Sequence, residues 1–572
     1  MSYQDTVAAR SGLVIGRQPA PAGRYERSLE WINDCVRNHK MCASYQKIIS
    51  TESSFPTRVL DVGLVAEDGI RLMSGSGLTG GYAALSHCWG TSPIIKTTKA
   101  LFDTFTNCIE FEKLSEVFRD SVSVTRSLGL RYLWIDSLCI IQDDARDWED
   151  EAANMAQVYS QAFVTISACV ASGGSGGLFP KELGRPFIKL SSMTETSPDL
   201  GILIGLPLHR FQSLSASPLS TRAWTLQERV LSTRILHHGF DQVHWECREA
   251  IKSEGNNPPF GSYLDSSQES SFHNGWLSRI SYDLMPESVF DSQFLGQHGH
   301  PRSHHDSWYG MVQEYTQRQL SYSDDKLPAL SGLANAYSKR HGVDYVAGLW
   351  AQDLWVGLLW YSRNNESLSR PQSYRAPSWS WASVDGPVDF FSINAGHVPI
   401  DTLDFEDGEH WIELTGKDPY GKIADGTLTL KGYIREAVIR TIEEDSEYDG
   451  VRLTKQIVCD EISAIGSATL DSPIPDGPIY CLKISSYYLI HGAKVNSALV
   501  LLLSPTENQD EWEFRREGFA VFFENREYNP DRTLRPTQRL EEWTNPYGDE
   551  GPDANTLHGW FDDGLWEHIC IV

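Results

Sequence analysis

The sequence predicts an α/β fold with a parallel sheet and flanking helices, followed by a mixed α+β region that is rich in strands. Between residues 75 and 250, short apolar runs bounded by glycine or polar residues alternate with segments of helical periodicity. This alternation is typical of a parallel sheet that is covered by helices on both faces. From about residue 379 onward the apolar runs are mainly strand-like, at residues 427–433, 480–484, 498–503 and 518–523.

Each element of the predicted sheet follows from its apolar pattern. Short apolar runs predict buried strands at residues 83–88, 132–141, 163–170 and 234–238. Apolar residues at helical spacing predict a helix over residues 114–128, ended by Gly129, and another over residues 148–162. Asp147 is the expected N-cap of the latter helix, and a further helix is expected to begin near Thr221.

The same patterns divide the chain into four regions. We expect an N-terminal helical segment at residues 1–74 and the α/β domain at residues 75–250. Residues 251–306 are rich in Ser, Gly, Pro and His with little periodicity, which is typical of a loop or linker. The mixed α+β region, rich in strands, follows at residues 307–572.

Composition limits the classes of partner. The chain has 572 residues, with 49 basic and 76 acidic side chains and a formal net charge of −27. This excess of acids argues against binding of nucleic acid or of an anionic membrane over a broad surface. The net charge does not exclude a local basic pocket. We find no apolar stretch long enough for a membrane span and no secretory signal. Ten sparsely spaced cysteines indicate reduced thiols, so we expect a cytoplasmic protein.

Three blocks of sequence carry a family resemblance. They run from Tyr82 to Gly90 (YAALSHCWG), from Trp134 to Gln142 (WIDSLCIIQ) and from Arg222 to Glu228 (RAWTLQE). In this order they closely resemble the fungal heterokaryon incompatibility (HET) domain family. Flanking strings at residues 55–58 and 378–382 also resemble the surroundings of this domain in long fungal members. The resemblance covers roughly residues 30–385.

The resemblance implies a role in fungal non-self recognition, or vegetative incompatibility, that ends in programmed cell death. The family is considered similar to TIR domains, which have a flavodoxin-like sheet, and TIR enzymes cleave NAD with a glutamate. In this sequence Trp224 and Glu228 keep the TIR spacing between tryptophan and glutamate, whereas Thr225 and Arg229 depart from the TIR string. The resemblance therefore implies Glu228 as the catalytic residue and NAD as a substrate, with no separate cofactor.

Side-chain chemistry independently favours Glu228. On a helix it would lie within the apolar stripe formed by Trp224 and Leu231, where a carboxylate is partly desolvated and its pKa rises. Cleavage of the nicotinamide–ribose bond passes through an oxocarbenium-like state, which a carboxylate beside the ribose would stabilise. The alternative is a structural ion pair with Arg222 or Arg234.

Three polar residues are further candidates for binding NAD. Asp136 ends a predicted strand at the carboxyl edge of the sheet, where open α/β folds bind ligands, or it caps a loop. Gln142 offers an amide to a ribose or base, or fixes its own loop. The planar guanidinium of Arg222 suits a pyrophosphate.

The remaining candidates for binding NAD are Ser86, Trp89 and Gly90, near the end of the first predicted strand, together with Trp224. Gly90 would let a phosphate approach the backbone, and Trp89 would stack on nicotinamide or adenine or, alternatively, anchor the core. We predict no metal site. Cys35, His39 and Cys42 have zinc-like spacing, but no fourth ligand is evident from the sequence, so this question stays open. The histidines at positions 298, 300, 304 and 305 are expected to belong to a polar loop; the alternative, that they bind a metal ion, is less favoured.

Three functional hypotheses follow. The first is cell death triggered by hydrolysis of NAD to nicotinamide and ADP-ribose. The second is a non-enzymatic, TIR-like interaction module that signals by self-association after the C-terminal region senses a protein partner. The third is a metabolic or biosynthetic role acquired by this family member. Similarity of fold alone does not choose between them.

Overall fold

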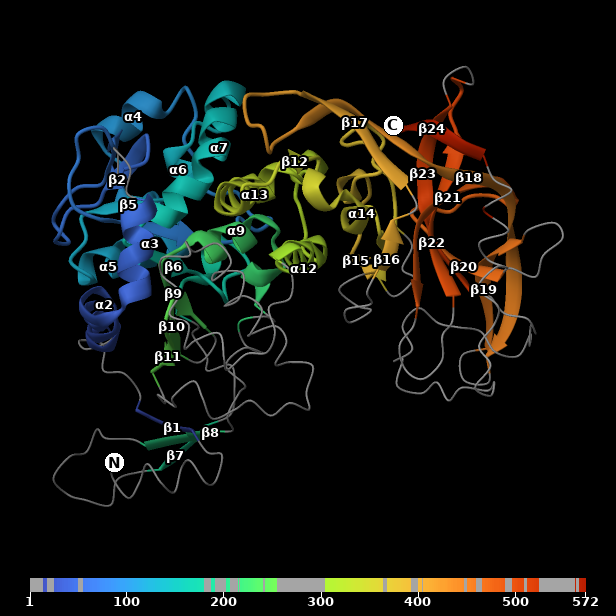
Figure 1. Ribbon diagram of the computed structural model, residues 1–572. Helices are drawn as coiled ribbons and strands as arrows, with labels where there is room; N and C mark the ends of the chain where they lie inside the picture. Colours follow the sequence, from blue (N-terminus) through green and yellow to red (C-terminus); the bar gives the residue numbers. More distant parts are fainter. Residues whose placement is uncertain are drawn as a thin grey trace. The chain divides into compact units, whose positions relative to one another are not determined.

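The computed structural model divides into two compact units, which are described separately (Figure 1). Unit 1 comprises residues 1–299, 318–320 and 328–340, and unit 2 comprises residues 300–317, 321–327 and 341–572. The structure describes residues 14–17, 25–49, 55–179, 187–190, 202–205, 214, 217–239, 242–254, 304–363, 368–391, 400–403, 405–446, 450–458, 465–488, 496–508, 512–523, 561 and 565–572.

Unit 1 is built on an eight-stranded sheet in the order β11-β10-β9-β6-β4-β5-β2-β3. In that order the strands are Ile251–Ser253, Val243–Cys247, Arg234–His238, Val164–Ser167, Tyr82–Ser86, Tyr132–Trp134, Arg58–Asp61 and Arg71–Ser74. The four central strands, β9, β6, β4 and β5, are mutually parallel, and the strands on either side of them are antiparallel. Every residue of β4, β6 and β9 is buried, as expected for parallel strands that are covered on both faces.

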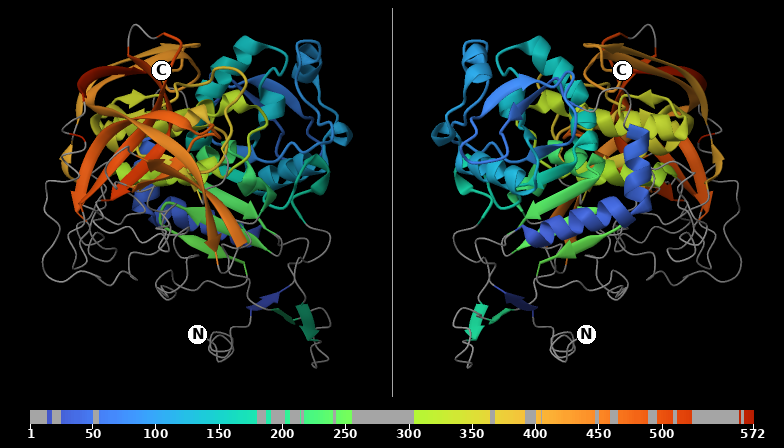
Figure 2. Two further views of the ribbon diagram at one scale, coloured as in Figure 1. Left: turned by 90° about the vertical axis from the view of Figure 1, so that its right-hand side faces the viewer. Right: turned by 90° about the vertical axis from the view of Figure 1, so that its left-hand side faces the viewer.

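Helices of unit 1 surround this sheet. They are α2 (Glu26–Asn38), α3 (Lys40–Ile49), α4 (Phe102–Asn107), α5 (Glu116–Ser127), α6 (Asp136–Cys139), α7 (Ala145–Gln161), α9 (Trp224–Leu231) and α13 (Pro328–His341, of which residue 341 falls in unit 2). Helix α2 contacts β10, and in the right-hand view of Figure 2 it lies beside the green strands of the sheet. A separate three-stranded sheet has the order β1-β8-β7, with strands Val14–Arg17, Ile202–Gly205 and Phe187–Leu190.

The sequence patterns locate most of these elements, with two corrections. The strand expected over residues 132–141 ends at Trp134, because the Asp136 carboxylate accepts the backbone N–H of Ser137 at 2.7 Å and the chain turns into the short helix α6. The N-cap of α7 is Asp144, which accepts the backbone N–H of Arg146, and not Asp147. Asp147 instead forms an ion pair with Arg58.

The N-terminal region contains more than helices. Helices α2 and α3 agree with the expected helical segment, but residues 58–74 also supply the edge strands β2 and β3. Both strands are only four residues long, and each includes charged side chains. Asp61 of β2 forms ion pairs with Arg71 of β3 and with Arg131, which precedes β5. These ion pairs help to hold β2 and β3 on the sheet, although their apolar pattern is weak.

Unit 2 is dominated by a nine-stranded sheet in the order β16-β21-β22-β23-β20-β19-β18-β17, with β24 pairing to β18 and β23. In chain order these strands are Ile400–Leu403, Phe405–Leu414, Ile423–Ser446, Gly450–Val458, Ile465–Leu470, Gly477–Tyr488, Asn496–Pro505, Glu513–Phe523 and Leu565–Ile571. The four strand runs expected beyond residue 379 fall within β18, β21, β22 and β23. The strand-rich C-terminal region is therefore confirmed.

The remainder of unit 2 consists of short elements packed around buried tryptophans. They are α12 (His304–Thr316), β12 (Tyr345–Val346), β13 (Leu349–Trp350), α14 (Leu354–Gly357), β14 (Trp360–Ser362) and β15 (Val388–Phe390). Most of the expected linker, residues 255–303, lies outside the described residues, as do the histidines at 298 and 300. Among the helices that the structure describes, none has the length and apolar character needed to cross a membrane.

Candidate functional site

The predicted site residues gather at the carboxyl ends of the central parallel strands. Ser86 is the last residue of β4, and Asp136 follows β5 by two positions. Arg222 precedes helix α9, and Glu228 lies on that helix. Ligands of open α/β sheets bind at this edge, because loops there converge and backbone groups are available.

A hydrogen-bonded group connects the loops after β4 and β5. The indole Nε1 of Trp89 donates to the Asp136 carboxylate at 2.7 Å, and Nδ1 of His87 lies 3.7 Å from the same carboxylate. The side-chain amide of Gln142 donates to the backbone carbonyls of Asp136 and Ile140. Trp89, Asp136 and Gln142 are thus brought together, and their polar atoms fix one another.

Arg222 joins this group from the chain segment before α9. Its guanidinium donates a hydrogen bond to the backbone carbonyl of His87. The positive charge of Arg222 favours the ionised form of Glu228 and, together with burial, lowers the pKa of His87. His87 is buried in contact with the Phe118 ring, so the imidazole is held in its neutral form.

Glu228 is the buried carboxylate of the site. Only 6% of the residue is exposed, and its Oε2 atom has no hydrogen-bond partner among the described residues. Burial raises the pKa of Glu228 to about 7, although Ser86, Arg222 and Tyr159 favour the charged form. In the part of the chain that the structure describes, neither Arg222 nor Arg234 forms an ion pair with it, since these guanidiniums donate to other groups.

Gly90 has a structural explanation. Its φ angle is +72°, and a Cβ atom there would lie 2.7 Å from the Cα of Gly173 and 2.9 Å from the carbonyl oxygen of Ser172. The loop after β6 therefore lies close to the Gly90 backbone. Gly90 is needed because two loops of the protein approach each other closely.

Ser86 and Trp224 occupy different surroundings. Ser86 is buried and borders a cavity of about 30 Å³, which is enough for one or two water molecules. Trp224 is the first residue of α9 and packs against the hydrophobic core of unit 1.

Sequence reasoning missed a second polar cluster at the same cavity. His237 of β9 lies with Nδ1 3.1 Å from the Ser167 hydroxyl and with Nε2 2.8 Å from the Glu246 carboxylate. Glu246 also pairs with Arg229 at 2.9 Å; burial alone would raise the pKa of Glu246, but the Arg229 charge and the hydrogen bond with His237 outweigh it and hold the pKa well below its usual range. Cys169 lies 3.7 Å from His237, and burial raises the pKa of its thiol to about 11, so it is not an activated nucleophile. The pairing of β9 with β6 on one side and with β10 on the other brings Ser167, His237 and Glu246 together.

A thiol–imidazole cluster is formed by a different set of residues of unit 1. Cys35, His39 and Cys42, which the sequence left without a fourth ligand, are joined by Cys247 from the end of β10. These four residues are the group in the described chain that could hold a metal ion.

Comparison with known proteins identifies the domain. The family model described as Heterokaryon incompatibility protein (HET) matches residues 82–228. No curated protein and no solved structure matches the chain significantly. The matched segment begins with β4 and ends at Glu228, so it contains all eight residues predicted for the NAD site. The chain therefore carries a domain of the heterokaryon incompatibility (HET) family at residues 82–228.

Proposed function

We propose that this protein acts in fungal vegetative incompatibility, where its HET domain causes programmed cell death in the cytoplasm by hydrolysing NAD. The observation that carries the proposal is Glu228, a buried carboxylate with a pKa of about 7 and no ion pair among the described residues. Perturbed carboxylates at the ligand-binding edge of a sheet are enriched in active sites.

The order of the parallel strands supports a TIR-like domain. Numbered along the chain, β4, β5, β6 and β9 are strands one to four, and they lie side by side in the order 2-1-3-4. This order is the beginning of the flavodoxin-like order 2-1-3-4-5, which binds its ligand between strands one and three. Ser86 and Ser167 end those two strands here, and Ser86 favours the charged form of Glu228.

The chemistry requires one carboxylate and a water molecule. As the bond between the nicotinamide nitrogen and ribose C1′ breaks, its electron pair leaves with nicotinamide and positive charge develops on the ribose. The ionised form of Glu228, populated to about half near pH 7, stabilises that charge. Water then adds at C1′ and loses a proton, which gives ADP-ribose. Arg222 is the candidate ligand of the NAD pyrophosphate. Trp89, Asp136 and Gln142 are the candidates for contacting the rest of the NAD molecule.

The test is release of nicotinamide from NAD by the purified full chain, followed by chromatography. We expect Glu228→Gln to lower the rate by about 100-fold or more, because an amide keeps the size of the side chain but not its charge. Glu151→Gln is the matched control. Glu151 is also a buried glutamate, but it lies on helix α7, and its carboxylate is 3.5 Å from the guanidinium of Arg58. The control variant should keep the wild-type rate.

Two outcomes would count against the enzyme. The first is equal background consumption of NAD by wild type and Glu228→Gln, even at concentrations that allow assembly. The second is unchanged cell death in a strain that expresses Glu228→Gln. If expression of the wild-type chain causes no death, and deletion leaves fusion between strains unchanged, the incompatibility role itself fails.

A non-enzymatic interaction module is the second candidate. It is favoured by the small cavity beside Ser86, about 30 Å³, and by the mutual hydrogen bonds of Trp89, Asp136 and Gln142. On this hypothesis the buried polar group stiffens the domain, which associates with further copies of itself after the C-terminal region senses a protein partner. Concentration-dependent assembly in light scattering, together with death that survives Glu228→Gln, would favour it over the enzyme.

A further inference from the structure

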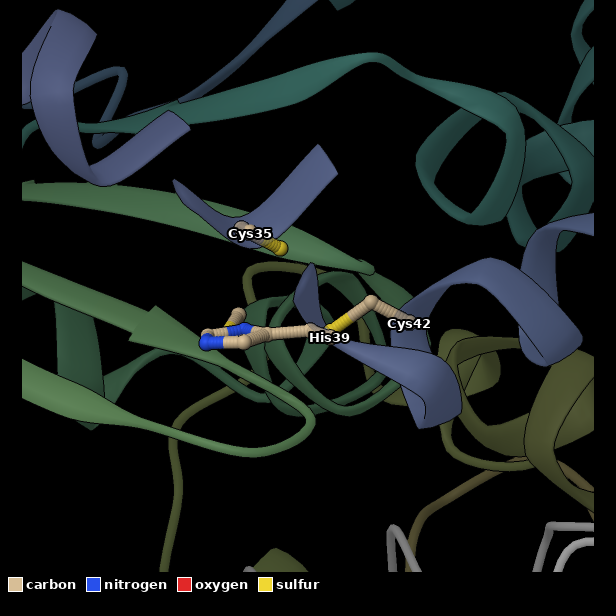
Figure 3. Close-up of side chains that lie close together, drawn as sticks. Cys35, His39 and Cys42 are labelled. Carbon is tan, nitrogen blue, oxygen red and sulfur yellow. The ribbon is translucent and has the colours of Figure 1, made fainter. Parts of the chain in front are cut away.

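Four potential metal ligands converge on one point in unit 1. Cys35 lies on α2, His39 between α2 and α3, and Cys42 on α3, as Figure 3 shows. Cys247 ends strand β10, 208 residues after His39. The three sulfur atoms and one imidazole nitrogen all lie within 4.8 Å of one another. The His39 Nδ1 atom is 3.3 Å from the Cys247 sulfur and 4.0 Å from the Cys42 sulfur.

We propose that Cys35, His39, Cys42 and Cys247 bind a structural zinc ion that fastens the N-terminal helix pair to strand β10 of the unit 1 sheet. In a tetrahedral zinc site, bond lengths of about 2.0–2.3 Å place neighbouring ligand atoms about 3.5–3.8 Å apart. The separations in the cluster are close to this range, so zinc binding needs only small side-chain adjustments.

The donor set selects zinc over other common metals. Thiolate and imidazole are soft or borderline ligands, whereas calcium and magnesium require oxygen atoms. Three cysteines and one histidine complete a four-coordinate site and leave no open position for water or substrate. Cys35 and Cys42 are fully buried, and His39 and Cys247 are half-buried. These features point to a structural rather than a catalytic ion.

The groups around the ligands also suit a metal centre. The Nε2 atom of His39 faces the Asp34 carboxylate at 3.8 Å, which leaves Nδ1 for the metal. Lys252, next to the β10–β11 hairpin turn, bonds to the same Asp34 carboxylate at 2.8 Å. A carboxylate behind a ligating histidine is the usual arrangement that orients the ring.

Arg234 gives an independent argument from charge. This arginine is 2% exposed, and among the described residues no carboxylate forms an ion pair with it. Its Nε atom donates to the Cys35 sulfur at 3.2 Å, and its other donors contact the Gln46 amide and the Phe163 carbonyl. A zinc ion with three thiolates and one neutral imidazole carries a net charge of −1, which would compensate this buried cation.

The site would join parts of the chain that flank the matched HET segment. None of the four ligands lies within residues 82–228. Zinc would therefore tie helices α2 and α3, which precede the segment, to strand β10, which follows it. Since such a site does not form in the unfolded chain, the binding free energy would stabilise the folded state of unit 1.

The experiment measures zinc in the full chain after expression in zinc-supplemented medium. We expect about one zinc ion per chain by mass spectrometry of the metal, and at least a tenfold loss in Cys247→Ser. Cys139→Ser, which alters a buried thiol of unit 1 outside the cluster, should keep its zinc. His39→Cys should also keep zinc, because four thiolates form an equally common site.

A spectroscopic measurement keeps the test decisive if Cys247→Ser fails to fold. Replacing zinc by cobalt(II) in the wild-type chain should give the visible absorption of tetrahedral, thiolate-bound cobalt, and that absorption should be lost when zinc is added back. The proposal is overturned if the folded wild type binds neither metal, if folded Cys247→Ser keeps its zinc, or if peptide mapping finds a disulfide among Cys35, Cys42 and Cys247.

Discussion

Two buried carboxylates, one in each compact unit, differ in whether a cation forms an ion pair with them. Asp471 of unit 2 is completely buried, lies 3.0 Å from Nε of Arg516 and has Arg370 at 3.8 Å. Arg516 also donates to the backbone carbonyl of Leu358 and stacks on the Trp360 ring. Glu228 of unit 1 is nearly as buried, but forms no ion pair with any described residue.

This difference distinguishes a carboxylate that stabilises the fold from one that is a candidate for catalysis. A buried charge with a complete set of partners holds two segments in one arrangement, and removing one partner leaves the other unpaired. A buried carboxylate without an ionic partner costs stability when it ionises, so its retention needs another reason. In this protein the second case occurs at the carboxyl ends of the parallel strands, where the fold places ligands.

The largest effect on stability should come from breaking the Asp471 pair. We expect Asp471→Ala to lower the free energy of unfolding of unit 2 by about 3–5 kcal/mol, because Arg516 would stay buried without its counter-charge. Urea titration measures the effect. Glu110→Ala, which removes an exposed pair to Lys113, should cost less than about 1 kcal/mol. Equal effects of the two variants would contradict a structural role for the buried pair.

The pH dependence of unit 1 tests the other side of the comparison. Burial raises the pKa of Glu228 from 4.5 to about 7, so between these pH values the unfolded chain releases a proton that the folded chain keeps. The free energy of unfolding should therefore fall by about 3 kcal/mol from pH 4.5 to pH 7 on account of this residue. Glu228→Gln should remove that part of the slope, measured by urea titration across the range. An unchanged slope would mean that the pKa of Glu228 does not differ between the folded and the unfolded chain.

A smaller effect tests how firmly the loop next to Trp89 is held. Gly90 and Gly129 have φ angles of +72° and +74°, but only Gly90 is crowded, with Gly173 2.7 Å from the position of an added Cβ. We expect Gly90→Ala to cost about 2–3 kcal/mol, and Gly129→Ala, which changes only the backbone preference, to cost about 1 kcal/mol. Thermal melting of both variants checks the difference. Similar melting temperatures would show that the loop around Gly90 rearranges to accept an added Cβ atom at no greater cost than the uncrowded turn at Gly129.

Local patterns in the sequence predicted much of the α/β domain. The strand Arg234–His238 was located to the residue, and helix α7 was found from apolar residues at helical spacing. These elements are recognisable because each buries one continuous run or one helical face. The position of Asp136 at the carboxyl edge of the sheet also followed from the rule that parallel strands end at one edge of the sheet.

Contacts between distant segments could not be predicted in this way. Trp89 and Asp136 are 47 residues apart, and their hydrogen bond depends on how two loops turn after their strands. Cys247 lies 208 residues from His39, so no spacing rule marks it as a fourth ligand. The role of Gly90 depends on the approach of Gly173, which is a property of the folded backbone.

The sheet order has a practical consequence for expressing the domain alone. The matched segment, residues 82–228, contains β4, β5 and β6 but omits β9, the parallel neighbour of β6. A fragment cut at those limits would leave the fully buried strand Val164–Ser167 as an edge with unpaired backbone groups, which promotes aggregation. Recombinant fragments that fold should extend from residue 25 to at least residue 340, so that both flanking pairs of edge strands and the parts of unit 1 at residues 318–320 and 328–340 are present.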